Sequence, residues 1–419
     1  MADQAELRWR LLTVRERSLD VQGDRDAQAV DIEAMEGLAD RRGDAVWQAH
    51  AAYRRSVMSQ RLGDWPACEA AGRRGMTLAA PSSQAASAAP GATHGPRLLC
   101  GRLVALALAK RGELAAGHAL ALACLQEARL HRLRSVESFC VNALAVIAGM
   151  RSDPVAALDY ALQDLAINRD LGNRRAEAIS LSCVGCGFMD LGEQDQASAH
   201  LQQSLQLLRA NGDRVIEGAT LCSLSTVALR QGDVAQAIDL AQAAVQMAAA
   251  VQSRDLKAIA LCKLGHAALA AARLDDAASA YQRCLELALA LDEPVRHDAR
   301  AGLAQVALAA GRPGQAMLSV QALLDHLDAA GSLDGAEDPL QIELRCHRVL
   351  AANGDPRAAG WLQRASTHLR ATAQKISDPA LRRSFVEQIP AHREIVALTD
   401  ALTDPLTDAL TVAPPAPLS

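Results

Sequence analysis

The stretch "LGEQDQASAHLQQSLQLLRANGD" (Leu191–Asp213) returns forty residues later as "QGDVAQAIDLAQAAVQMAAAVQS" (Gln231–Ser253). Gly192 and Gly232 occupy equivalent places near the start of the two copies. Forty residues are too few for an independent domain, but they suffice for a pair of short packed elements. The repetition therefore predicts a supersecondary unit that the chain uses more than once.

The turn that opens each copy recurs along most of the chain. Its positions are Gly23, Gly63, Gly112, Gly192, Gly232, Gly311 and Gly354, with weaker versions at Ser152 and Ala272. From Ser152 to Ala272 each step is 40 residues. A second series of turns lies between the first, at Gly172, Gly212, Gln252 and Asp292. Two turns per period leave two segments of roughly 16 residues, enough for about four helical turns each. The unit is predicted to be a helix hairpin, and a chain of such hairpins is a solenoid.

A small residue stands five places after each turn of the first series from Gly63 onward. These residues are Cys68, Gly117, Ala157, Ala197, Ala237, Ala277, Ala316 and Ala359. A recurring small side chain is expected where two helices cross closely. The composition agrees with a helical protein, because half of the chain is hydrophobic while only 2% is aromatic. The core must therefore be built mainly from Ala, Leu and Val, and Ala and Leu favour helix.

These features together resemble the tetratricopeptide repeat (TPR). The resemblance rests on Gly185 and Gly265 seven residues before a turn, on Phe188 at an aromatic position, and on the Gly turn with Ala five residues later. It is closest to the 40-residue bacterial variety of the repeat. The resemblance implies an all-α, right-handed α-solenoid of about nine antiparallel helix hairpins over residues 1–373. A Pro/Ser-rich loop insertion is expected at residues 80–96.

The C-terminal part departs from the repeat. Residues 374–398 are expected to form a capping helix over the last hairpin, with Asp378 as N-cap and Pro379 at the first helical position. This segment resembles the one that ends TPR-like sensor arrays of bacterial signalling proteins, including nucleotide cyclases and LuxR-type regulators. Residues 399–419 are polar and rich in proline, so a disordered tail is expected.

Charge and targeting signals exclude several classes of protein. The net charge of −5 gives no general attraction to nucleic acid or to anionic membranes. The N-terminal residues are charged throughout and lack the apolar segment of a signal peptide. A cytoplasmic bacterial protein is expected, in which the ten cysteines are reduced thiols.

No catalytic constellation emerges from the motifs. Cys183 and Cys186 have the spacing of a zinc or redox pair, but no second pair stands at a matching distance. Cys222 and Cys262 occupy equivalent places in successive repeats, which indicates that cysteine serves as a small hydrophobic residue. The eleven histidines are scattered and form no metal-binding motif. The sequence therefore predicts no enzyme, no cofactor and no metal ligand.

The remaining candidate is the concave surface, which the first helix of each hairpin lines in such arrays. The resemblance places eight partner-binding residues there, namely Asn142, Ser182, Cys186, Thr226, Ile259, Lys263, His266 and Gln305. Lys263 and His266 lie one helical turn apart in mid-array, where a cation among apolar neighbours could fix the register of a bound segment. Two alternatives stay open: Lys263 could extend into solvent and pair with nothing, and the small lining could reflect tight helix packing alone.

The expected function is a non-catalytic protein-interaction or sensor module in bacterial signal transduction. It would bind a partner peptide or helix in the concave groove, with no nucleic acid and no membrane involved. One alternative is the regulatory part of a nucleotide cyclase or ATPase-type regulator that lacks its catalytic domain. Another is a self-assembling scaffold whose groove holds a second copy.

Overall fold

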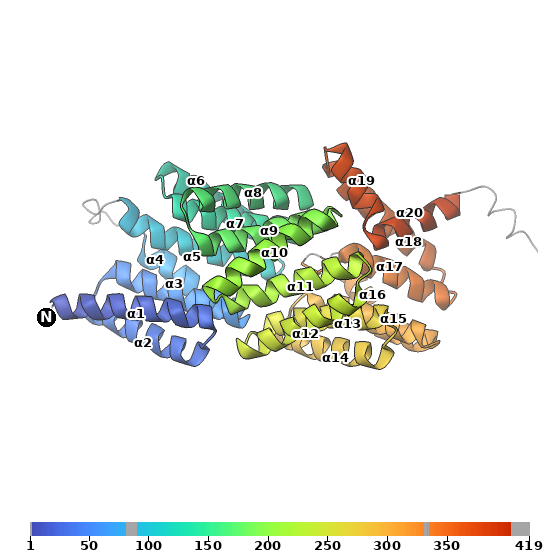
Figure 1. The fold of residues 1–419 in the computed structure, drawn as a ribbon, viewed down its shortest axis with the longest axis horizontal. Coiled ribbons are helices and arrows are strands. Elements are labelled where there is room, and N and C mark those ends of the chain that lie inside the picture. Colours follow the sequence, from blue (N-terminus) through green and yellow to red (C-terminus); the bar gives the residue numbers. More distant parts are fainter. Residues whose placement is uncertain (1, 81–89, 331–332, 334, 404–419) are drawn as a thin grey trace, which may run out of the picture.

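The chain is a continuous array of α-helices (Figure 1), and the part that the structure describes contains no strand. The computed structural model describes residues 2–80, 90–330, 333 and 335–403. The helices are α1 (Ala2–Gln22), α2 (Arg25–Arg42), α3 (Ala45–Leu62), α4 (Trp65–Leu78), α5 (Pro90–Lys110), α6 (Leu114–Leu130), α7 (Arg134–Met150), α8 (Pro154–Asp170), α9 (Arg174–Asp190), α10 (Gln194–Asn211), α11 (Arg214–Arg230), α12 (Val234–Ala250), α13 (Arg254–Ala270), α14 (Leu274–Leu291), α15 (Val295–Ala309), α16 (Pro313–Ala330), α17 (Pro339–Ala352), α18 (Ala358–Lys375), α19 (Pro379–Glu387) and α20 (Pro390–Thr403). Successive helices from α1 to α18 pack against one another, which confirms the all-α solenoid. None of the described helices is both long and apolar enough to span a bilayer.

The turns between helices follow the two series expected from the sequence. Every position of the first series has a positive φ, including the non-glycine residues Ser152 (52°) and Ala272 (57°). Gln252 and Asp292 of the second series share this left-handed conformation. It ends a helix and reverses the chain, and glycine adopts it without the steric cost that a Cβ adds. Aspartates then cap several of the following helices, as Asp233 does by accepting the N–H of Gln236.

The small residues mark the helix crossings, with one exception. Ala197 and Ala237 are completely buried, and a Cβ built on Gly117 would lie only 2.5 Å from the carbonyl oxygen of Ala105. Ala359, however, is exposed, so the prediction is wrong in the last hairpin. There the helix begins four residues after its turn rather than two, and the buried position moves to Trp361.

Two expected boundaries also need correction. The loop insertion expected at residues 80–96 is shorter, because residues 90–96 already belong to α5; residues 81–89 lie outside the described part. The single capping helix is a pair, α19 and α20, and α20 runs to Thr403 with Thr399 buried. Residues 399–403 are therefore helical rather than part of a tail. Residues 404–419, where the rest of the tail was expected, lie outside the described residues.

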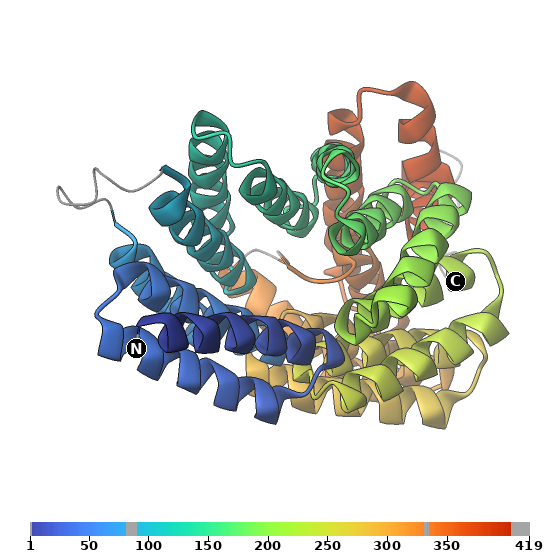
Figure 2. The same cartoon turned by 60° about the vertical axis from the view of Figure 1, so that its left-hand side comes forward.

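Residues of the N-terminal hairpins contact residues from the middle of the chain. Figure 2 shows the dark-blue N-terminal helices beside the green ones, in agreement with the packing of α1 on α11. The indole Nε1 of Trp65 donates to Glu293, and the Lys110 ammonium lies 3.9 Å from the same carboxylate. Gly23 sits directly against Val251. The solenoid is therefore wound tightly enough for residues more than two hundred positions apart to touch.

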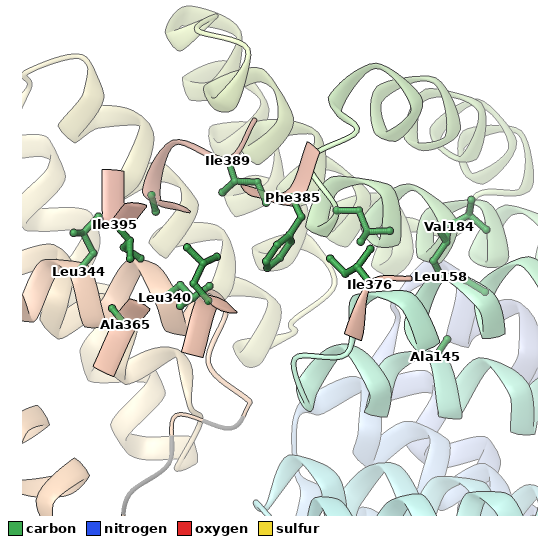
Figure 3. Close-up of a cluster of buried hydrophobic side chains, with 14 of the residues drawn as sticks. Ala145, Leu158, Val184, Leu340, Leu344, Ala365, Ile376, Phe385, Ile389 and Ile395 are labelled. Carbon is green, nitrogen blue, oxygen red and sulfur yellow. The ribbon is translucent and has the colours of Figure 1, made fainter. Parts of the chain in front are cut away.

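The C-terminal pair, α19 and α20, packs against the last hairpin and against helices from the middle of the array. Figure 3 shows Phe385, Ile376 and Ile389 between Leu158 of α8 and Leu340 of α17, all in one buried cluster. Phe385 and Ile389 are 4% and 2% exposed. The pair thus covers the last hairpin and also joins it to the middle of the array.

Candidate functional site: the inner face of the solenoid

The inside of the superhelix is crossed by the chain's own residues Gly335–Asp338, which we call the crossing segment (Figure 2). Its first N–H donates to the carbonyl oxygen of Met150 at 3.3 Å. The N–H groups of Glu337 and Asp338 donate to the two carboxylate oxygens of Asp298 at 3.1 and 3.3 Å. The segment is therefore held through its backbone, in the way that a bound peptide would be.

The side chains of the crossing segment meet cations of the inner face. The carboxylate of Glu337 lies 2.9 Å from the ammonium of Lys263 on α13, and that of Asp338 lies 3.7 Å from the guanidinium of Arg230 on α11. The Lys263 side chain is only 12% exposed. These residues and Asp298 form the central cluster, with two cations and three carboxyl groups.

The pKa values of the carboxyl groups in this cluster are shifted in different directions. Desolvation raises the pKa of Asp298 to about 7, and the neighbouring Glu337 carboxylate adds to the rise. The ammonium of Lys263 holds the pKa of Glu337 below its usual range. Burial opposes the charge of Lys263, but Glu337 outweighs it, so the pKa of Lys263 is raised. Desolvation also raises the pKa of nearby Asp190 to about 6. The inner face thus holds carboxyl groups that change charge near neutral pH.

Lys263 itself is therefore not an unpaired cation. The alternative in which it extends into solvent without a partner is wrong, because its ammonium forms an ion pair with Glu337. His266, one turn further on α13, is turned toward the adjacent helix instead. Its Nδ1 lies 2.6 Å from the hydroxyl of Tyr281 and 3.4 Å from the guanidinium of Arg345. Burial and the two cations Arg345 and Lys263 hold the pKa of His266 well below its usual value.

Three of the expected residues, Asn142, Ser182 and Cys186, have polar or thiol groups as neighbours. Asn142 donates to Asp164 at 3.4 Å, and Ser182 shares a hydrogen bond of 3.1 Å with Thr220. The thiol of Cys186 lies 3.3 Å from the hydroxyl of a serine on α11, and burial raises the pKa of that thiol to about 11. A thiol with such a pKa stays protonated at neutral pH and is a poor nucleophile.

The other three expected residues differ in their surroundings. Thr226 donates back to its own helix, to the carbonyl oxygen of Cys222 at 3.3 Å. Ile259 packs half-buried against an apolar cluster of α10 to α13. The amide oxygen of Gln305 accepts from Arg348 at 3.3 Å, which places it near the C-terminal pair. Among the described contacts, none links Asn142 or Gln305 to the central cluster.

Two cavities border the crossing segment. The larger has a volume of about 560 Å³ and lies between the α7–α8 turn and helices α17 and α18. Leu333 and Pro339, on either side of the crossing segment, both line it, together with the cationic side chains of Arg151 and Lys375. The smaller, of about 100 Å³, lies between the central cluster and the C-terminal pair. The crossing segment therefore has open space beside it.

Sequence reasoning missed the crossing segment and Asp298. The signal was present, because 43 residues separate Gly311 from Gly354 and the regular step is 40. The surplus falls in the acidic stretch before Pro339. A surplus reveals an insertion, but the repeat pattern does not say whether the insertion points outward or into the superhelix.

Comparisons with known proteins agree with the fold. No family model matches the sequence, and no curated protein matches it. Among solved structures, the chain is similar to a Rap protein crystallised in complex with Competence and Sporulation Factor, with a TM-score of 0.54 and 12% identity over 96% of this chain and 99% of that chain. It is also similar to the apo form of the quorum sensor NprR from B. thuringiensis, with a TM-score of 0.52 and 12% identity over 85% of this chain and 97% of that one. At these identities the likeness shows the fold, which is that of TPR-like repeat proteins.

Proposed function

We propose that this chain is a non-catalytic interaction or sensor module of bacterial signal transduction, located in the cytoplasm. It binds a peptide or an extended segment of a partner protein on the inner face of the solenoid. The observation that carries the proposal is the crossing segment, because it occupies the inner face with hydrogen bonds from its backbone and ion pairs from its side chains. A surface that holds one extended segment in this way has the chemistry to hold another.

The charge of the inner face suggests the kind of partner. Lys263 and Arg230 both pair with carboxylates of the crossing segment. An incoming segment with acidic side chains reproduces these ion pairs, whereas a basic one leaves two partly buried cations unpaired. We therefore expect an acidic, extended partner segment that replaces the crossing segment or binds beside it in the larger cavity.

The solved structures support this class of function. One of them is a Rap protein in complex with Competence and Sporulation Factor, and the other is described as a quorum sensor. Both share the fold over most of their length. No residue correspondence is transferred from them, because the identity is 12% in each case.

Crosslinked capture from a bacterial lysate, quantified by mass spectrometry, tests the proposal. Lys263→Glu should reduce capture of the main partner about tenfold, because it reverses a central charge of the inner face. The matched control is Arg283→Glu on the exposed side of α14, which should leave capture unchanged. Glu337→Gln should increase capture, since it weakens the hold on the competing crossing segment. Equal capture by all three variants, each confirmed as folded, excludes the inner face as the binding site.

The two alternatives give different outcomes in the same experiment. A self-assembling scaffold captures mainly its own sequence, so the chain itself becomes the principal prey. A regulatory part of a cyclase or ATPase-type regulator captures a catalytic domain, which then accounts for the enrichment.

A further inference from the structure

A group of two histidines and one glutamate stands apart from the inner face, where α5 begins and α6 ends. His94 comes from α5, Glu127 from the last turn of α6, and His131 caps the C-terminal end of α6. One ligand atom from each residue lies within 4.8 Å of the other two. The two imidazole rings have centroids 4.0 Å apart. Within the described residues this is the one group of three or more such side chains that comes together.

From this arrangement we propose a divalent transition-metal site, with zinc as its best match. Two imidazole nitrogens and one carboxylate oxygen are a donor set that zinc accepts, and they leave a fourth tetrahedral position for water. Zinc–ligand bonds of about 2.0–2.1 Å place neighbouring ligand atoms about 3.3 Å apart. The three side chains are each only partly buried, so small rotations can close the remaining gap. The ion would tie the first turns of α5 to the end of α6.

The surroundings contain one favourable and one opposing charge effect. The end of α6 presents the negative end of the helix dipole, which favours a cation. Arg97 opposes it, because its guanidinium forms an ion pair with Glu127 and places a positive charge at the same carboxylate. Removing the charge of Arg97 should therefore strengthen metal binding, a result that a purely structural ion pair would not produce.

The test is a calorimetric titration of the full chain with zinc alone, after chelator treatment and under reducing conditions. The unmodified chain should bind one equivalent of zinc. The double variant His94→Ala/His131→Ala should bind zinc at least about tenfold more weakly. The matched control is His326→Ala, which removes one ring of another close histidine pair, His297 and His326, whose centroids are 4.6 Å apart. This control should keep the affinity of the unmodified chain.

Two further measurements test the metal site independently of the double variant. Arg97→Gln should raise the zinc affinity severalfold, and this variant decides the question if the double variant loses helix content. Cobalt should give the visible bands of nitrogen and oxygen coordination without a thiolate charge-transfer band, because none of the proposed ligands is a cysteine. Equal affinities of the double variant and the unmodified chain, a thiolate band, or an unchanged affinity of Arg97→Gln each overturns the assignment.

Discussion

The ammonium of Lys263 and the carboxylate of Glu337 lie 2.9 Å apart, although 74 positions separate them in the sequence. The ion pair joins the mid-array helix α13 to the crossing segment before α17. Both side chains are less than a third exposed, at 12% and 29%. A pair this far from water loses much when one partner is neutralised, since the other charge then lacks compensation.

Glu337→Gln is therefore expected to lower the free energy of unfolding by about 1–3 kcal/mol. The measurement is urea denaturation followed by circular dichroism. Asp276→Asn serves as the control, because its ion pair with Arg273 is more than half exposed on both sides and should change stability by less than about 0.5 kcal/mol. Equal effects of the two substitutions would contradict the assignment of Glu337 to a sheltered pair.

Asp298 gives the stability a distinct pH dependence. Its pKa is about 7 in the folded chain, against an ordinary value of 3.8. Between pH 4 and 7 the folded protein therefore retains a proton that the unfolded chain has released. The stability that this group contributes is complete at low pH and falls as the pH rises toward 7.

The stability of the unmodified chain relative to Asp298→Asn should consequently decrease from about pH 4.5 to about pH 7. Taking this difference cancels the contributions of Asp190 and of the buried histidines, which both proteins share. Urea midpoints measured across that range check the prediction. A difference that stays constant, or that grows with pH, would show that Asp298 is already ionised at the lower end.

The helix crossings should not tolerate added volume. Ala237→Leu forces three further carbon atoms into a site that is completely buried, so a loss of about 1–3 kcal/mol in stability is expected. Ala235→Leu lies two residues earlier on the exposed side of α12 and should have little effect. Comparison of the two melting temperatures gives the result, and similar values would mean that α12 packs with a different face.

Replacing a non-glycine turn residue of positive φ by glycine should increase the stability of the chain. Ala272 has a φ of 57°, where an L-residue with a Cβ is strained by about 1 kcal/mol. Ala272→Gly is therefore expected to stabilise the chain by roughly 0.5–1 kcal/mol, while Ala270→Gly, inside the end of α13, should destabilise it by a similar amount. Chemical denaturation distinguishes the two signs. A loss of stability for Ala272→Gly would contradict the explanation of the turn.

The fold could be predicted from the sequence because the signals that define the repeat are local. Turn residues, small residues at crossings and the N-cap Asp378 each act within a few positions of the chain, and the structure confirms the N-cap. The exception, Ala359, follows from two extra residues between Gly354 and α18. A fixed spacing rule cannot detect that change.

The contents of the inner face depend on contacts between distant positions, and these leave no periodic signal. The pairing of Lys263 with Glu337 and that of Trp65 with Glu293 arise only when the superhelix closes. His94, Glu127 and His131 likewise gather only when α5 packs on α6. The helical pattern predicts which residues face inward, but it does not predict which part of the chain lies against them.

The most direct test of the proposed function is to map where a partner attaches. A small photoreactive amino acid at position 259, one helical turn before Lys263 on α13, should crosslink to a segment of the main captured partner. The same amino acid at position 283, on the exposed side of α14, should not crosslink to it. Peptide mapping by mass spectrometry should further identify an acidic partner segment at position 259. Crosslinks to that partner from position 283 alone would place binding on the outer surface and contradict the account.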